Sequence, residues 1–353
     1  MRVGVARAAA VDWVMQHARW QDGFRGAYVS GSTVGLPADA ELPTGSDVDV
    51  VVVTSQAEPP LKLGKFMHRG ALLEVTYLPW SRIASVDDVL ASYHLAGSFR
   101  ADTIIADPTG DLRRLQVQVS RLFAKQVWVR RRCEDARQKA EQGLRGIDIA
   151  APWPDQVMAW LFPTGVTTHI LLVAALRNPT VRLRYLAARE VLVAYAHAGL
   201  YQDLLCLLGC AELTLQRVDH HLLALARTFD AAAATAKTPF FFSSDITPDA
   251  RPIAIDASRD LIQADCHREA VFWIVATFAR CHKIPAVDAS PDVQHALAPA
   301  FDALLADLDI ASTDDLLARA ASVIRFLPTV WAAAEAILST NPEILTTVED
   351  GQQ

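Results

Sequence analysis

The chain has 353 residues, of which 52% are hydrophobic and 21% are charged. This balance is typical of a folded protein and excludes an intrinsically disordered chain, and the length predicts about two domains. The net charge is −7, divided as −2 over residues 1–115 and −5 over the rest. Neither part has the basic excess that binds nucleic-acid duplexes, so we do not expect a duplex partner.

The composition also bears on the compartment. Five scattered cysteines lack the spacing of a disulfide framework, which favours buried thiols in a reducing environment over a zinc site. Arg2 and Arg7 precede only a short apolar stretch, so no signal peptide is expected. The longest apolar runs, 170–176 and 271–279, are shorter than the roughly 20 residues that cross a bilayer. We expect a cytoplasmic protein with no membrane partner.

Strand patterns are confined to the first third of the chain. Residues 6–20 predict an amphipathic helix, with one face made by Val11, Val14, Met15 and Ala18. Expected strands follow at 26–31, 47–53, 71–78 and 103–107. The segment 33–46 is rich in Gly, Pro, Ala and Thr and is expected to be a loop. Residues 1–112 therefore predict a small domain built on a mixed sheet.

Residues 113–353 predict a large all-helical domain, so the fold class is α+β. Helical patterns cover 112–143, 165–177, 180–198, 211–236, 260–281, 291–308 and 313–338. Breaks between some of them are expected at Pro152, Pro154, Pro163 and Pro179. Residues 238–252 contain three adjacent phenylalanines, which predict either a docked flap or a long connection packed by its aromatic rings.

Asp47 and Asp49 open a run that is otherwise purely valine, through Val53. In a strand, residues i and i+2 point to the same face about 7 Å apart, so the two carboxylates can converge on one point. Mg²⁺ prefers oxygen ligands and is commonly held by one or two carboxylates together with substrate phosphates. The pair predicts a divalent-metal site, with a solvated turn residue as the alternative for Asp47.

Gly31, Ser32 and Glu74 add to this pair. Gly31 and Ser32 follow an expected strand, where a glycine lets the backbone approach a phosphate and a hydroxyl can bind it; an ordinary turn is the alternative. Glu74 interrupts an apolar strand, which is costly unless it meets a cation or an open cleft; an exposed edge strand is the alternative. If its strand pairs beside that of Asp49, Glu74 becomes a third carboxylate at the metal site.

The order of these features resembles that of the polymerase-β-like nucleotidyltransferase superfamily. A strand, Gly-Ser, a loop and Asp-x-Asp at a strand start appear here as VSGSTVGLPADAELPTGSDVDVVVV (29–53). Within the superfamily the chain is most similar to the aminoglycoside adenylyltransferase branch, where a strand like ALLEVT (71–76) carries a Glu and a helical domain follows. Fourteen residues separate Ser32 from Asp47, a longer linker than is usual in the family.

The resemblance implies an enzyme that transfers a nucleoside monophosphate, expected to be AMP from ATP, to a hydroxyl of a small-molecule acceptor and releases pyrophosphate. Gly31 and Ser32 would hold the triphosphate, and Asp47 and Asp49 would bind Mg²⁺. Glu74 would act as the general base or complete the metal site, and the base role is the one favoured in this branch. The helical domain would bind the acceptor, for which an aminoglycoside is one candidate.

Two alternatives keep part of this interpretation. The same chemistry could use a protein or RNA acceptor, although the even charge distribution argues against RNA. A nucleotide-binding module without catalysis is the other alternative, and three acids in costly positions argue against it.

The sequence does not predict the oligomeric state. It also leaves open which basic residues contact the triphosphate. The two candidate sets are Lys125, Arg132 and Lys139 on one helix face, and Arg182, Arg184 and Arg189 after Pro179.

Overall fold

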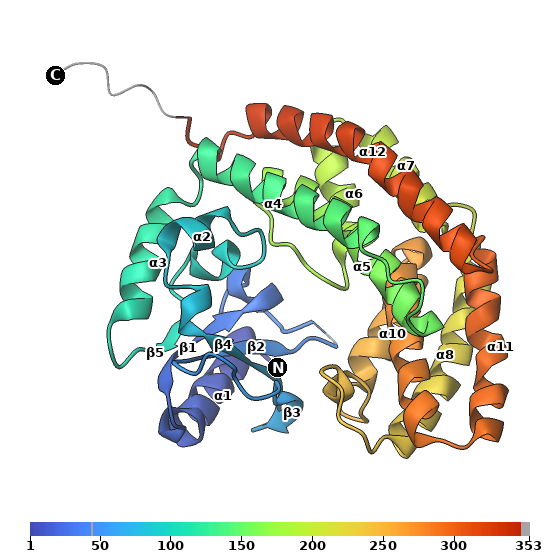
Figure 1. Cartoon of the computed structure of the whole chain (residues 1–353). Helices are drawn as coiled ribbons and strands as arrows, with labels where there is room; N and C mark the ends of the chain where they lie inside the picture. The colour runs from blue at the N-terminus through green and yellow to red at the C-terminus, as the bar shows by residue number, and fades with distance from the viewer. Residues whose placement is uncertain (44, 347–353) are drawn as a thin grey trace.

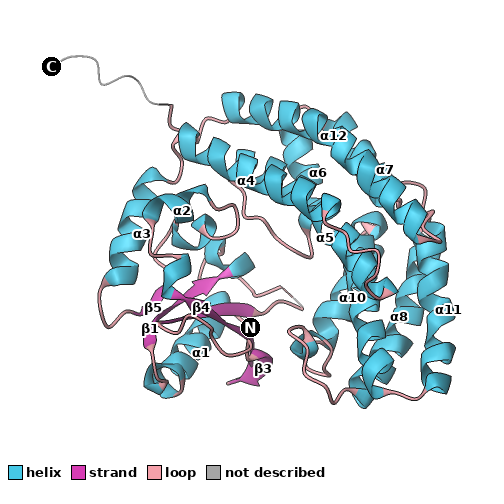
Figure 2. Ribbon diagram, viewed as in Figure 1, coloured by secondary structure: helices cyan, strands magenta, loops and turns pink. Residues whose placement is uncertain are grey.

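A computed structural model describes residues 1–43 and 45–346. The N-terminal part is built on one small sheet, and a larger arc of helices follows it (Figures 1 and 2). The predicted α+β class is therefore confirmed in its coarse form. The strands are β1 Phe24–Ser30, β2 Val48–Thr54, β3 Gly64–His68, β4 Ala71–Pro79 and β5 Ile104–Ala106.

The five strands form one mixed sheet in the order β3-β4-β2-β1-β5. Only β2 and β4 are parallel, and the other neighbouring pairs are antiparallel. The parallel pair places the strand of Asp49 directly beside that of Glu74, as the candidate metal site requires. Beyond Ala106 the described residues contain no further strand, only an isolated bridge between Lys125 and Leu345.

Helices cover both faces of the sheet. α1 (Val3–Gln16) packs on one face, where it meets the side chains of Val50 and Val52. α2 (Val86–Ala91) and α3 (Asp111–Leu122) pack on the other face, which carries Val53. The alternation of the valines along β2 reflects the two-residue period of a strand that is buried on both sides.

Two details of the N-terminal part differ from the sequence expectations. Val14 and Ala18 are buried as expected, together with Ala6, Ala10 and Trp13, whereas Val11 and Met15 are exposed. β3 was not expected; it forms a tight hairpin with β4 through Arg69 and Gly70, both at positive φ, as favoured two-residue turns require.

The rest of the described chain is helical. Its helices are α4 Gln126–Arg145, α5 Trp153–Ala174, α6 Arg184–Ala194, α7 Ala198–Leu208, α8 Leu215–Thr235, α9 Ala257–Gln263, α10 His267–Asp288, α11 Pro291–Asp307 and α12 Thr313–Thr340. The expected helices 112–143 and 260–281 are each divided in two, and α7 was missed. The expected break at Pro163 is wrong, because this residue lies inside α5. Pro163 packs against Gly143 of α4, whose missing side chain makes room for the ring.

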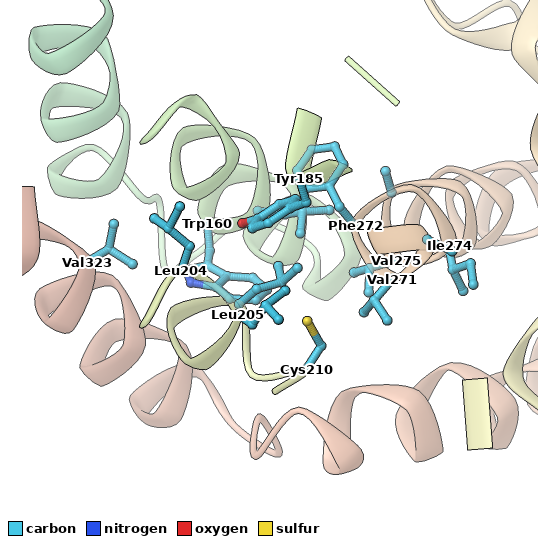
Figure 3. Packing of buried hydrophobic residues seen from close by; sticks show 14 of the residues in the cluster. Trp160, Tyr185, Leu204, Leu205, Cys210, Val271, Phe272, Ile274, Val275 and Val323 are labelled. Carbon is cyan, nitrogen blue, oxygen red and sulfur yellow. The ribbon is translucent and has the colours of Figure 1, made fainter. Parts of the chain in front are cut away.

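One continuous hydrophobic core holds the helical part together. Figure 3 shows Trp160 beside Leu204 and Leu205, and Tyr185 near Phe272. α5, α10 and α12 are long and apolar enough to cross a membrane by length and composition alone. In the structure α5 and α10 contribute much of this core, which accounts for their apolar composition.

The two parts meet around the Gly31 turn. The Asn178 side chain, in the link between α5 and α6, donates a hydrogen bond of 2.9 Å to the carbonyl oxygen of Gly31. The Arg100 guanidinium donates to the Leu176 carbonyl at 3.2 Å. The boundary expected at residue 112 falls at the start of α3, whose Leu115 and Val119 pack on the sheet. The independent folding of residues 1–112 and 113–353 stays a prediction.

Candidate metal centre

Four polar residues form a row across the sheet. Ser30 on β1 is paired with Asp49 on β2, Asp49 with Glu74 on β4, and Glu74 with Lys65 on β3. Directly paired residues in a sheet point to the same face. Val50 and Val75, their next neighbours in sequence, point to the α1 face, so the row lies on the opposite face.

Three carboxylates converge in this row. One oxygen each from Asp47, Asp49 and Glu74 lies within 4.8 Å of the others. Asp47 immediately precedes β2, and Asp49 and Glu74 lie within their strands. The prediction that Asp47 and Asp49 share a face is therefore confirmed, and so is the pairing that brings Glu74 beside them.

Burial and the repulsion between neighbouring carboxylates disfavour the ionised forms of Asp47 and Asp49. Burial raises the pKa of Asp49 well above its usual value, and the charges of Asp47 and Glu74 raise it further. Burial also raises the pKa of Asp47, although Lys65 partly offsets this effect. Among the described residues, none donates a hydrogen bond to the Asp49 carboxylate or forms an ion pair with it. Asp49 is thus a nearly buried carboxylate without a direct cationic contact among the described residues, and the charges of Lys65 and Lys62 offset its raised pKa only in part.

Glu74 is in the opposite situation because two lysines hold it. The Lys62 ammonium donates to one carboxylate oxygen at 2.7 Å, and the Lys65 ammonium donates to the other. Burial alone would raise the pKa of Glu74, but the two lysines lower it to about 2. Glu74 is therefore firmly ionised, whereas a general base works best with a pKa near neutrality.

Lys65 also connects the centre to the helical part. Its ammonium lies 3.1 Å from an oxygen of Asp47 and 2.8 Å from an oxygen of Asp245. Asp245 lies in the connection between α8 and α9, and its second oxygen accepts a hydrogen bond of 3.1 Å from Arg280 on α10. Only 8% of the Lys65 side chain is exposed. Burial opposes its charge, but Asp47, Asp245 and Glu74 together raise the pKa of Lys65.

Gly31 begins a tight 3₁₀ turn, Gly31–Gly35, directly after β1. Its φ is +70°, in the left-handed region that favours glycine, and a side chain at this position would overlap the Asp49 carboxylate. The backbone of the turn therefore lies against the candidate metal ligands. Ser32 is exposed on the turn, where its hydroxyl is free to approach a ligand.

Contacts from two directions hold this turn in place. Arg7 on α1 donates hydrogen bonds to the carbonyl oxygens of Thr33 and Leu36, the latter at 2.9 Å. Asn178 binds Gly31 from the helical side. These bonds use carbonyl groups and leave amide groups of the turn available to an anion, which suits the phosphate-binding role expected for Gly31 and Ser32.

The basic residues singled out in the sequence have different positions. Arg132 is buried and donates to the carbonyl oxygens of Leu90 and Phe123, so the expected face with Lys125 and Lys139 is not a continuous basic surface. Of the second set, Arg184 is buried beneath Phe272, and Arg189 pairs with Glu269.

Of the six basic residues singled out in the sequence, Arg182 alone shows a charge interaction with the centre, through Asp47. Burial lowers its pKa, and the charge of Asp47 partly restores it. Lys62, Lys65, Asp245 and Arg280 were not singled out in the sequence. Lys62 and Lys65 lie shortly before the strand of Glu74 in the sequence, and this proximity is the one signal that could have found them.

The residues present fit a hard divalent cation. Three carboxylates offer the oxygen ligands that Mg²⁺ prefers. In the described part of the chain, no lysine, arginine or histidine forms an ion pair with Asp49. The cysteine and histidine pairs at 266–267 and 281–282 belong to no such cluster among the described residues. The five cysteines are free thiols, four of them buried, as the sequence indicated.

Comparisons with known proteins leave the chemistry to be argued from this geometry. No protein-family model matches the chain, and no curated protein matches it in sequence.

Proposed function

We propose that the chain is a Mg²⁺-dependent nucleotidyltransferase that transfers a nucleoside monophosphate, AMP from ATP in the simplest case, to an acceptor hydroxyl. One observation carries the proposal: Asp47, Asp49 and Glu74 converge beside the left-handed Gly31 turn. This combination offers a divalent metal and a triphosphate adjacent places on one face of the sheet.

The proposed reaction is an in-line displacement at the α-phosphorus. The acceptor oxygen forms a bond to phosphorus as the bond to the β-phosphate oxygen breaks, pyrophosphate leaves, and the hydroxyl proton passes to Glu74 or to water. Gly31 and Ser32 would orient the leaving phosphates. A bound Mg²⁺ would supply charge neutralisation for the phosphate oxygens, held by Asp47 and Asp49.

The contacts of Glu74 favour the metal-ligand role over the base role expected from the resemblance. Both of its oxygens accept hydrogen bonds from ammonium groups. Binding a metal ion would exchange one cation for another at this carboxylate. Action as a base would require both Lys62 and Lys65 to withdraw without replacement, which leaves a buried anion unpaired.

The first prediction tests the metal centre. Asp49→Asn should weaken Mg-ATP binding at least tenfold, about 1.4 kcal/mol, because it removes a ligand that no other residue replaces. The same change should raise the thermal stability of the metal-free protein, since it neutralises a carboxylate without a cation; the gain is on the order of 1 kcal/mol. Isothermal calorimetry and thermal denaturation measure the two effects.

Asp22→Asn is the matched control, because Asp22 is an exposed acid of the same part of the chain. It should change neither quantity. Unchanged Mg-ATP affinity in Asp49→Asn would rule out the proposed metal site.

The second prediction separates the two roles of Glu74. As a metal ligand, Glu74→Gln should weaken Mg-ATP binding as Asp49→Asn does. As a base, it would keep near-parent affinity and slow transfer by about 10²–10⁴-fold. We expect the first result, measured by calorimetry alongside pyrophosphate release over a panel of hydroxyl acceptors. Parent-like affinity together with parent-like turnover would show that Glu74 has neither role.

The non-catalytic alternative is decided by the same assay. Tight Mg-ATP binding without pyrophosphate release for any small-molecule, protein or RNA acceptor would favour a nucleotide-binding module. A cytoplasmic location and the absence of a membrane partner remain part of the proposal.

A further inference from the structure

The candidate centre has two chemically different sides. Gly31 follows β1 on one side of the carboxylates, and Lys65 lies on β3 on the other side. Three strand spacings separate β1 from β3, or about 14 Å. In an in-line displacement the leaving group and the attacking group lie on opposite sides of the phosphorus. With pyrophosphate on the Gly31 turn, the acceptor must approach from the Lys65 side.

The Lys65 side is rich in cations. Lys62 and Lys65 both contact Glu74, while Lys65 and Arg280 both contact Asp245. Without a metal, the charges of Asp47 and Glu74 help to balance these cations. A divalent ion on the three carboxylates would offset two of their three negative charges, and Asp245 would be the one acid that still contacts Lys65 and Arg280 among the described residues. The net charge of these seven side chains would then change from about −1 to about +1.

Arg280 supplies an independent observation. Only 9% of its side chain is exposed, and its Nε atom is buried without a hydrogen-bond partner. It lines a pocket with room for about one water molecule, together with Lys65, Asp245, Trp273 and Thr277, so an anion would enter only as Lys62 and Lys65 release Glu74. The Trp273 indole nitrogen is also buried without a partner. Two unused donors beside a cationic cluster are the groups that bind an anion.

We propose that Lys62, Lys65 and Arg280 form an anion subsite for the acceptor, which becomes available when a metal occupies Asp47, Asp49 and Glu74. The acceptor would carry a phosphate or carboxylate group near its reactive hydroxyl. A polycation such as an aminoglycoside is disfavoured on this side, because like charges oppose its approach. This inference rests on the proposed function and names the acceptor class.

The test uses inorganic phosphate as the probe of the full-length protein. The protein is first saturated with Mg²⁺ and α,β-methylene-ATP, which cannot release pyrophosphate, and phosphate is then titrated in a calorimeter. We expect phosphate to bind in the presence of the analogue. Phosphate binding should be at least tenfold weaker in Lys62→Gln and in Arg280→Gln, and at least tenfold weaker for the parent without Mg²⁺.

Arg259→Gln is the matched control, because Arg259 pairs with Asp256 on neighbouring turns outside the pocket. It should bind phosphate as the parent does. Lys62 is more exposed than Arg280, so Lys62→Gln keeps the test valid if Arg280→Gln fails to fold.

Three outcomes would overturn the inference: no phosphate binding to the analogue complex, equal binding in Lys62→Gln and the parent, or phosphate binding that the analogue abolishes. The last outcome would assign the subsite to the nucleotide's own phosphates. Failure of the analogue itself to bind would instead reject the proposed function, so the two failures are distinguishable.

Discussion

At the scale of single residues, the centre depends on the close packing of the Asp49 carboxylate against the backbone of Gly31. Gly31 has a left-handed backbone, and the Asp49 carboxylate fills the volume where its side chain would be. This arrangement brings the Gly31 turn, the candidate phosphate site, directly against the carboxylate of Asp49, a candidate metal ligand. A residue of any other type would have to move either the turn or the carboxylate.

Gly31→Ala tests this point. The substitution should destabilise the protein by at least about 1–2 kcal/mol, because an L-residue resists positive φ, and the overlap with Asp49 adds to this cost. Mg-ATP affinity should fall at least tenfold because Asp49 is displaced. Chemical denaturation and calorimetry report the two effects.

Gly199→Ala is the matched control, since nothing lies within 4 Å of the added carbon in α7. It should be neutral or stabilise the protein by up to about 1 kcal/mol. A Gly31→Ala variant with parent stability would contradict the described geometry.

At the scale of elements, the connection between α8 and α9 links the helical part to the sheet. Asp288 anchors its start by accepting hydrogen bonds from the backbone of Lys237 and from Thr238. Phe242 is buried in the helical core. Asp245 then reaches Lys65 on β3. The expected alternatives are thereby resolved in favour of a segment docked on the sheet, packed in part by its aromatic rings.

Asp245→Asn should loosen this docked segment. The change removes the charge that binds Lys65 and Arg280, and a charged hydrogen bond contributes about 1.5–3 kcal/mol. Local opening, and with it chymotrypsin cleavage after the exposed Phe241, should increase about tenfold. Limited proteolysis followed by mass spectrometry measures the rate. Asp249→Asn, an exposed acid of the same segment, should leave it unchanged, and an equal rate in both variants would exclude the anchoring role.

At the scale of the whole molecule, buried histidines make stability depend on pH. His169 is a buried residue of α5. One ring nitrogen donates a hydrogen bond of 2.8 Å to the Thr180 carbonyl, and the other is buried without a hydrogen-bond partner. Burial, with a contribution from Arg184, lowers the pKa of His169 to about 3. The folded protein therefore holds this ring neutral, while the unfolded chain titrates it near about 6.5.

The sign of the effect follows from this difference. Between about pH 6.5 and 3 the unfolded chain binds the additional proton, so the stabilising contribution is fully present above pH 6.5 and is lost as pH falls. In His169→Gln this loss is absent. The difference in unfolding free energy between parent and variant should shrink by about 2 kcal/mol from pH 7.5 to 5.0.

Urea denaturation at the two pH values measures this difference. His220→Gln, at an exposed position of α8, is the control and should show less change with pH. A parent–variant difference that is constant between the two pH values would show that His169 is not held neutral.

The sequence alone determined the parts that depend on local pattern. The valine run with Asp47 and Asp49 predicted β2 and a shared carboxylate face, because a strand has a period of two residues. The change to helical periodicity predicted the division into a mixed-sheet part and a helical part. It did not predict β3, which lacks β-branched residues, or the exposure of Val11 and Met15 on α1, which depends on how the helix packs on the sheet.

Only the tertiary structure decided which distant residues complete the centre. The parallel pairing of β2 with β4 brings Glu74 beside Asp49, and the register of the hairpin brings Lys65 beside Glu74. Asp245 and Arg280, which complete the centre, lie more than 150 residues after Lys65 and Glu74 in the sequence. Local sequence does not predict such long-range contacts, because strand order and helix docking are set by the burial of complementary surfaces over the whole chain. The predicted carboxylates therefore came from the sequence, and the cations that surround them came from the fold.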